Sequence, residues 1–144
     1  MKSFIKICIG LTILWPVAFV QEPNVVWTKT FGGNMGDKAY SVQQTSDGGF
    51  IIAGETYSFG ANKQAYIIKV DALGNLQWQR SLGTSGSDDA LHVQQTSDGG
   101  FIATGTYDEF GTGDVFLIKM YPSGALEWIR QINLGHSEWG QWCG

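Results

Sequence analysis

The sequence predicts an all-β protein built from repeated four-stranded units. The first observation behind this prediction is that the nine residues Val42–Phe50, VQQTSDGGF, recur unchanged at Val93–Phe101. The second is that short segments rich in β-branched and aromatic residues alternate with turn-forming sequences around both copies. The third is that no stretch of helix length carries apolar residues at a 3.6-residue period.

The repeat extends well beyond the shared nine residues. Val42–Gly54 and Val93–Gly105 agree at 11 of 13 positions, and the patterns Ile-Lys and Gly-x-Leu-x-Trp recur further along the chain. Trp27 lies 51 residues before Trp78, which indicates part of an earlier unit. The expected organisation is a leading strand at about 25–32, repeat units at about 33–82 and 84–132, and a truncated third unit at 133–144.

Each unit divides into four strands joined by recognisable turns. In the first unit the strands are expected at about 38–45, 49–57, 65–71 and 75–82. Ser46-Asp-Gly48 separates the first pair, and Asp-Gly is a strong hairpin signal because both residues can take positive φ. Asp71–Gly74 separates the last pair, and its copy at 121–124 has a proline where a type I turn favours it.

The third strand of each unit indicates how the units meet. Ala65–Val70 and Val115–Met120 are apolar on both faces apart from one lysine each. A sheet covered on one face would alternate apolar and polar residues, so these sheets are expected to stack face to face. Trp78 and Trp128 are available as wedges between them. Four-stranded sheets stacked at a period near 50 residues are typical of β-propeller blades.

The motifs resemble a known class of repeats. An Asp before the first strand, T-S-D-G-G-F, a downstream A-G or T-G, I-K and G-x-L-x-W resemble the propeller repeats of secreted bacterial and archaeal surface proteins. Those repeats mostly have no assigned activity. Ile68–Trp78 is also similar to the tryptophan-docking repeat of pyrroloquinoline-quinone propellers. That second likeness is structural, since such tryptophans clamp blades in many propellers that bind no quinone.

The number of units implies an incomplete propeller. A closed ring takes four to eight blades, and this chain supplies about two. Either several chains close a ring together or the chain is a fragment of a longer repeat protein. The fragment is favoured because the sequence ends inside a unit, and exposed blade faces would allow self-association.

Residues 1–20 have the pattern of a secretory signal peptide. Two lysines precede an apolar run at Ile7–Val20, which is short for a bilayer of about 30 Å, so a signal is favoured over an uncleaved anchor. Residues 21–144 carry a net charge of −6, which disfavours nucleic acid and anionic lipid as partners. Cys8 lies in the signal, so Cys143 has no partner for an internal disulfide.

Two pairs of repeated aspartates are candidate binding residues. Asp47 and Asp98 could be calcium ligands, but the D-G-G sequence lacks the alternating ligands of calcium loops, so turn residues are expected. Asp37 and Asp88 open the first strand of each unit. They could bind a cation or ligand at a central face, but capping of turn amides is favoured.

The remaining candidates also have structural explanations. The basic residues that recur are Lys69, Lys119, Arg80 and Arg130. They are expected to pair with the repeated aspartates or to occupy exposed edge positions. His92 and His136 do not recur and have no second ligand at metal spacing. The tryptophans could stack on a sugar, but their fixed repeat positions favour the core.

The function expected from the sequence is therefore non-enzymatic binding or scaffolding, outside the cell or in the periplasm. Everything that the units share is structural, and we assign no catalytic, cofactor or metal residue. The expected partner is a protein or a glycan. The alternatives are a fragment of a quinoprotein-like oxidoreductase and a carbohydrate-binding propeller.

Overall fold

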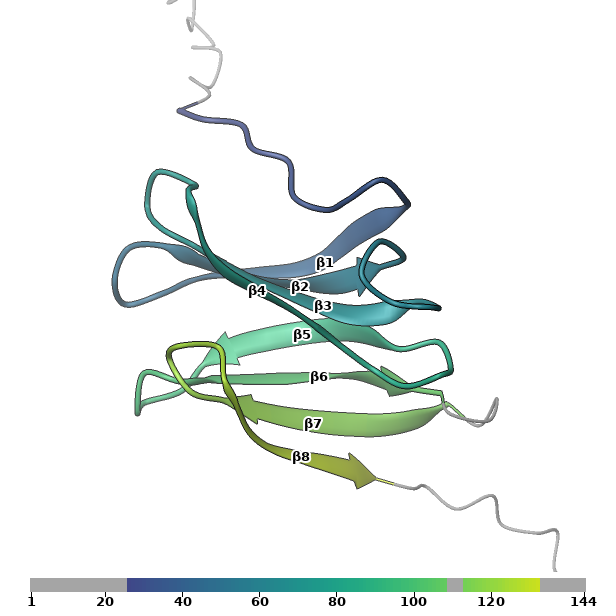
Figure 1. The fold of residues 1–144 in the computed structure, drawn as a ribbon. Coiled ribbons are helices and arrows are strands. Elements are labelled where there is room, and N and C mark those ends of the chain that lie inside the picture. Colours follow the sequence, from purple (N-terminus) through teal and green to yellow (C-terminus); the bar gives the residue numbers. More distant parts are fainter. Residues whose placement is uncertain (1–25, 109–112, 133–144) are drawn as a thin grey trace, which may run out of the picture.

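The computed structural model describes residues 26–108 and 113–132, which form eight β-strands in two antiparallel sheets (Figure 1). We call the sheet ordered β1-β2-β3-β4 blade 1 and the sheet ordered β5-β6-β7-β8 blade 2. The strands are β1 (Asp37–Gln44), β2 (Phe50–Thr56), β3 (Gln64–Val70), β4 (Leu76–Leu82), β5 (Asp89–Gln95), β6 (Phe101–Tyr107), β7 (Asp114–Met120) and β8 (Leu126–Ile132).

This architecture confirms the predicted all-β fold of two four-stranded, propeller-like units. Each predicted strand of the first unit is within one residue of the observed bounds, and the two stacked blades do not close into a ring (Figure 1). No helix among the described residues has the length and hydropathy that crossing a bilayer requires. The predicted signal peptide at 1–20 and the truncated unit at 133–144 lie outside the described residues.

The duplicated nine residues form the end of one strand, a hairpin loop and the start of the next strand. In blade 1 the Gly48 amide donates to the Thr45 carbonyl, and Gly48 has a φ of 80°. Asp47, like every other described residue that is not glycine, does not have a positive φ. The hairpin predicted at Ser46-Asp-Gly48 is therefore confirmed as a three-residue loop, in which the glycine has positive φ and Asp47 does not.

A bulge at the same place in each first strand explains the repeated glycine of the A-G and T-G motifs. Register shifts between Ala39 and Ser41 in β1, and between Ala90 and His92 in β5. A Cβ placed on Gly54 would meet the Lys38 carbonyl oxygen at 1.8 Å. Only glycine allows the second strand to approach the bulged strand this closely.

The core lies between the two blades. From blade 1, Ile51 and Ile67 are fully buried, and from blade 2, Phe101 and Phe116 pack against them. All seven residues of β3 are buried, so the prediction that both faces of this strand need cover is confirmed. Side chains alternate along β3, and Ile67 therefore faces blade 2 while Ile68 faces away from it.

The face of blade 1 turned away from blade 2 is covered in part by the segment that precedes β1. Phe31 from this segment packs beside Ile68 and Val70, and the Trp27 ring lies edge-on to Phe50 at 5.9 Å between centroids. Residues 26–32 nevertheless belong to no strand, so the predicted leading strand at about 25–32 is wrong over its described part. A strand needs a hydrogen-bonding neighbour, and no described strand pairs with this segment.

The two blades are joined by a tryptophan that docks on a turn. Trp78 in β4 donates its indole N–H to the Pro122 carbonyl at 3.1 Å, and its ring lies edge-on to Phe101 at 5.6 Å. The ring lies over Gly124, where an added Cβ would come within 2.6 Å of it and where φ is 77°. The Arg80 guanidinium lies over the Trp78 ring, and its Nε donates to the Gly124 carbonyl at 3.0 Å.

Replacing Trp78 tests how far this docking stabilises the fold. We expect Trp78→Ala to lower the free energy of unfolding by about 3 kcal/mol, because it removes ring packing and a hydrogen bond between the blades. Trp128 occupies the same place in blade 2 but contacts no further blade among the described residues, so Trp128→Ala is the matched control. It should cost less than about 1 kcal/mol. Urea denaturation of both variants, at protein concentrations low enough for single chains, measures the difference, and equal losses would contradict the docking role.

Candidate functional site

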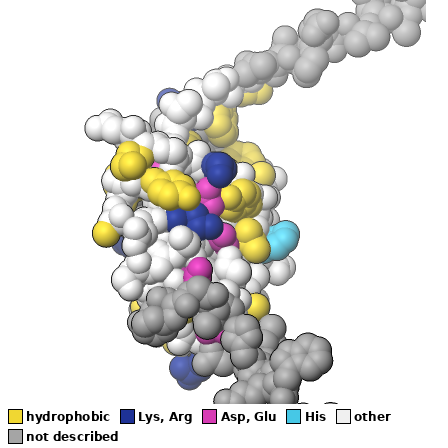
Figure 2. Space-filling view, turned by 90° about the vertical axis from the view of Figure 1, so that its right-hand side faces the viewer, with side chains coloured by type: hydrophobic (Ala, Val, Ile, Leu, Met, Phe, Trp, Pro, Cys, Tyr) yellow, Lys and Arg dark blue, Asp and Glu magenta, His cyan; other side chains and the backbone are white. Residues whose placement is uncertain are grey.

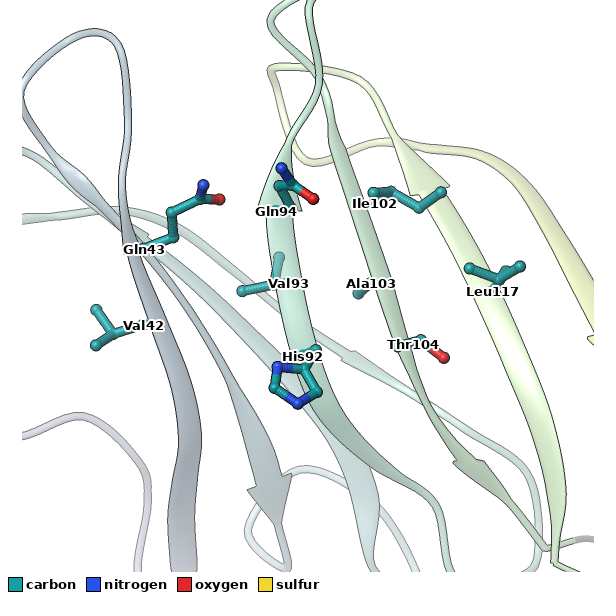
Figure 3. Close-up of a pocket in the computed structure, with 9 residues that line it drawn as sticks. All are labelled: Val42, Gln43, His92, Val93, Gln94, Ile102, Ala103, Thr104 and Leu117. Carbon is teal, nitrogen blue, oxygen red and sulfur yellow. The ribbon is translucent and has the colours of Figure 1, made fainter.

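The outward face of blade 2, which is the face turned away from blade 1, contains an open groove of about 450 Å³. Figure 3 shows residues from β5, β6 and β7 across the groove, with β1 of blade 1 at one side. The lining side chains include His92, Gln94, Ile102, Thr104 and Leu117. Strand pairing sets them in rows, because His92 is opposite Thr104 and Thr104 is opposite Leu117.

The apolar residues of this groove are not covered as their counterparts in blade 1 are. Ile102 and Leu117 are half-buried, whereas the equivalent Ile51 and Ile67 are fully buried against blade 2. The outward face of blade 2 is therefore the same kind of surface as the inner face of blade 1, but without a described neighbour.

The polar groups of the groove differ in how they are engaged. The Gln43 side-chain oxygen accepts from the Gln95 amide at 2.8 Å, and the Thr104 hydroxyl donates to the Phe116 carbonyl at 2.8 Å. The exposed His92 and Gln94 side chains form no hydrogen bond with other described residues. The groove thus combines apolar surface with two polar side chains that are available to a ligand or a partner protein.

A cluster of charges links the blades at the end where β1 begins and β2 ends. Lys63 lies 3.4 Å from Glu55 in its own blade and 2.8 Å from Asp89 in blade 2, while Lys38 lies 2.8 Å from Glu55. Figure 2 shows basic and acidic side chains interleaved on this end of the molecule. The cluster could not be recognised from the repeat, because its members do not recur: Thr106, Gly113 and Lys38 are the counterparts of Glu55, Lys63 and Asp89.

The pKa values in this cluster follow from burial and ion pairing. Burial of Glu55 raises its pKa, but hydrogen bonds from Lys38 and Tyr40 and the charge of Lys63 outweigh burial, so the pKa lies below its ordinary value. The pKa of Asp89 is lowered in the same way, because Lys63 and Thr106 outweigh its burial. Both carboxylates are therefore charged at neutral pH and stabilise the junction between the blades.

The repeated aspartates of the hairpins act as turn and ion-pair residues. Asp47 accepts from the Gly49 amide at 3.0 Å and lies 2.9 Å from the Lys69 Nζ, and Asp98 repeats both contacts with Gly100 and Lys119. Hydrogen bonds from Thr45 and Lys69 lower the pKa of Asp47 to about 2. The predicted turn role of Asp47 and Asp98 and the predicted ion pairs of the two lysines are confirmed.

The aspartates that open the first strands cap the preceding loops. Asp37 accepts from the Gly33 amide at 3.0 Å and from the Ser58 hydroxyl at 3.1 Å. Asp88 accepts from the Thr84 amide at 2.6 Å and from the Asp108 amide at 3.1 Å. Amide capping is confirmed for both, and this shared contact gives a structural reason for their recurrence.

The recurring arginines have different roles in the two blades. Arg80 is half-buried and donates to backbone carbonyls of the next blade. It therefore neither forms the predicted ion pair nor occupies the predicted exposed position. Arg130 is exposed on the edge strand β8, as predicted, and its guanidinium lies over the Trp128 ring at 5.9 Å. His136 and Cys143 lie outside the described residues, as does Cys8.

The described residues contain no group of three or more His, Cys, Asp or Glu side chains arranged to hold a metal ion.

Comparison with known proteins adds no family: no protein-family model matches the chain, and no curated protein is significantly similar to it. The candidate site rests on the geometry of the outward face of blade 2.

The ion pair of Asp47 predicts an acid-sensitive contribution to stability. Because the pKa of Asp47 is about 2 in the folded protein and 3.8 ordinarily, this contribution is complete above about pH 5 and is lost as the pH falls toward 2. The difference in unfolding free energy between wild type and Asp47→Asn should shrink over that interval. Denaturant titrations from pH 6 to pH 2 measure it, with the same pair in a Lys69→Met background as control. A difference that does not change with pH would contradict the ion pair.

The junction cluster predicts a larger effect for its buried member than for its exposed member. Glu55→Gln should lower the free energy of unfolding by about 2–3 kcal/mol, because it leaves Lys63 with one carboxylate and removes charge-assisted hydrogen bonds. Lys38→Gln should cost less than about 1 kcal/mol, since the Lys38 side chain is 65% exposed. Thermal and urea unfolding compare the two variants. An equal loss of unfolding free energy in Lys38→Gln and Glu55→Gln would contradict this prediction.

Proposed function

We propose that the protein is a non-enzymatic, secreted or cell-surface module of propeller-like blades that serves binding or scaffolding. The proposal is supported by what the repeated residues do. The hairpin aspartates, the lysines of the third strands and the loop-capping aspartates contact other parts of the fold. In the described part of both blades these repeated charged residues thus have structural contacts, which supports a role in the fold over chemistry on a substrate.

The binding surface in this proposal is the outward face of blade 2. The single observation that carries it is the contrast between equivalent residues: Ile67 is fully buried, while Leu117 is half-buried in a groove beside His92 and Gln94. Apolar surface that is rimmed by polar side chains is typical of protein interaction sites. Such a face favours a partner that covers an extended sheet over a small molecule that enters an enclosed cavity.

Secretion is part of the proposal and is supported by the sequence of residues 1–20 alone. Two lysines and the apolar run Ile7–Val20 fit an exported precursor. The net charge of −6 over residues 21–144 fits a partner other than nucleic acid.

Quinone binding is the test that separates this function from an oxidoreductase. Purified protein mixed with pyrroloquinoline quinone and calcium is expected to retain no chromophore after gel filtration. In a second experiment, a glycan array is expected to give the same background signal for wild type and for the control variant Leu117→Arg. Leu117 is on the groove surface, so the variant should keep the wild-type melting temperature within a few degrees. A stoichiometric quinone complex would refute the non-enzymatic function, and glycan binding lost in Leu117→Arg would replace the protein partner with a carbohydrate.

A further inference from the structure

We propose that the outward face of blade 2 binds blade 1 of a second copy of this chain, in the way that blade 1 binds blade 2 within one chain. The inference rests on the proposed binding function and names its partner. Two copies of the repeat are already docked face to face in one chain, so the structure shows which two surfaces fit each other.

The outward face of blade 2 carries the groups that dock blade 1 onto blade 2. Trp128 and Arg130 correspond to Trp78 and Arg80, and the guanidinium lies over the ring at 5.9 Å in one pair and 5.8 Å in the other. Trp128 is opposite Lys119, as Trp78 is opposite Lys69. The docking tryptophan and arginine are therefore stacked in blade 2 as they are in blade 1.

Other positions on this face also match the inner face of blade 1. Ile102 and Leu117 correspond to the buried Ile51 and Ile67. Gln94 corresponds to Gln43, whose side chain accepts from the Gln95 amide of the neighbouring blade. Gln94 is exposed and is available for the same bond to an added blade.

Blade 1 carries the complementary surface. Its Gly74 has a φ of 75°, as the Gly124 beneath Trp78 has a φ of 77°. The outward face of blade 1 also repeats the apolar residues with which blade 2 faces blade 1. Phe50 corresponds to Phe101, Tyr66 to Phe116, and Ile68 to Ile118.

In the single chain this surface is capped by the segment before β1. Trp27 donates its indole N–H to the Ala72 carbonyl at 3.2 Å and lies over Gly74, which is the contact that Trp78 makes with Pro122 and Gly124. A second copy must therefore place its Trp128 where Trp27 lies. Residues 26–30 belong to no strand and are mostly exposed, and the Trp27 indole hydrogen bond ties them to blade 1. Displacing them is therefore a local rearrangement.

The contact between copies should be weaker than the junction inside the chain. The intramolecular junction includes the Glu55, Lys63 and Asp89 cluster. Between copies, Thr106 and Gly113 would face Lys38 instead. Because one face meets a different face, the association is heterologous, and it ends in a ring if the rotation closes. Rings of four to eight blades correspond to two to four copies.

The test is the mass of the purified full chain in solution over a range of concentrations, by light scattering or sedimentation. Wild type is expected to shift with concentration from one chain to a species of two to four chains. Trp128→Ala should weaken the association at least about 30-fold, since central tryptophans are typical hot spots. Trp27→Ala should strengthen it, because it removes the competing ring from the docking turn. The double variant Trp27→Ala, Trp128→Ala should lose the gain.

Circular dichroism and melting curves establish that each variant is folded, and Leu117→Glu on the groove surface is a second disrupting variant that leaves both tryptophans intact. Wild type and Trp27→Ala that both stay single chains would overturn the inference. So would an assembly that is insensitive to Trp128→Ala and Leu117→Glu. Association that appears only after removal of residues 133–144 would assign the face to that segment instead. None of these outcomes involves quinone binding, so the failure of this inference can be told apart from the failure of the proposed function.

Discussion

The structure depends on one contact, the docking of Trp78 on the turn that ends at Gly124. Each blade is a small antiparallel sheet with apolar side chains on both faces, and such a sheet is unstable in water until a neighbour covers it. Trp78 fixes the angle and register at which the neighbour arrives, because its N–H bonds the Pro122 carbonyl and its ring fills the space above the glycine. The Trp78 ring also packs against the cluster of apolar residues buried between the blades.

The same contact explains the difference between the two ends of the molecule. At blade 1 a tryptophan from the preceding segment occupies the docking turn, although that segment is not a strand. At blade 2 the docking tryptophan Trp128 is stacked with Arg130, but no turn of a neighbouring blade lies against it among the described residues. The outward face of blade 1 is covered in part, whereas the outward face of blade 2 has no described neighbour and contains the groove beside His92.

Local signals in the sequence were enough to predict the strands, the hairpins and the stacking of the sheets. The repeat, the turn glycines and the two-sided apolar third strand each report on neighbours close in sequence or on burial. Two features could not be predicted in this way. Residues 26–32 have strand-like composition but no pairing edge, and pairing is a property of the whole assembly. The cluster of Glu55, Lys63 and Asp89 joins residues from separate loops and strands, and it leaves no trace in the repeat.

That unrepeated cluster has a consequence for folding. Two hairpins that share nine identical residues can exchange places during folding, and adjacent repeats of high identity are prone to such misassembly. The Lys63 ammonium, which Glu55 contacts within blade 1, reaches Asp89 when blade 1 lies against blade 2 in the native order. Thr106 and Gly113 stand in the places of Glu55 and Lys63 in the other blade. The charges therefore distinguish the two sheets where their sequences are alike, and they favour the native order of the blades over the alternative pairing within the chain.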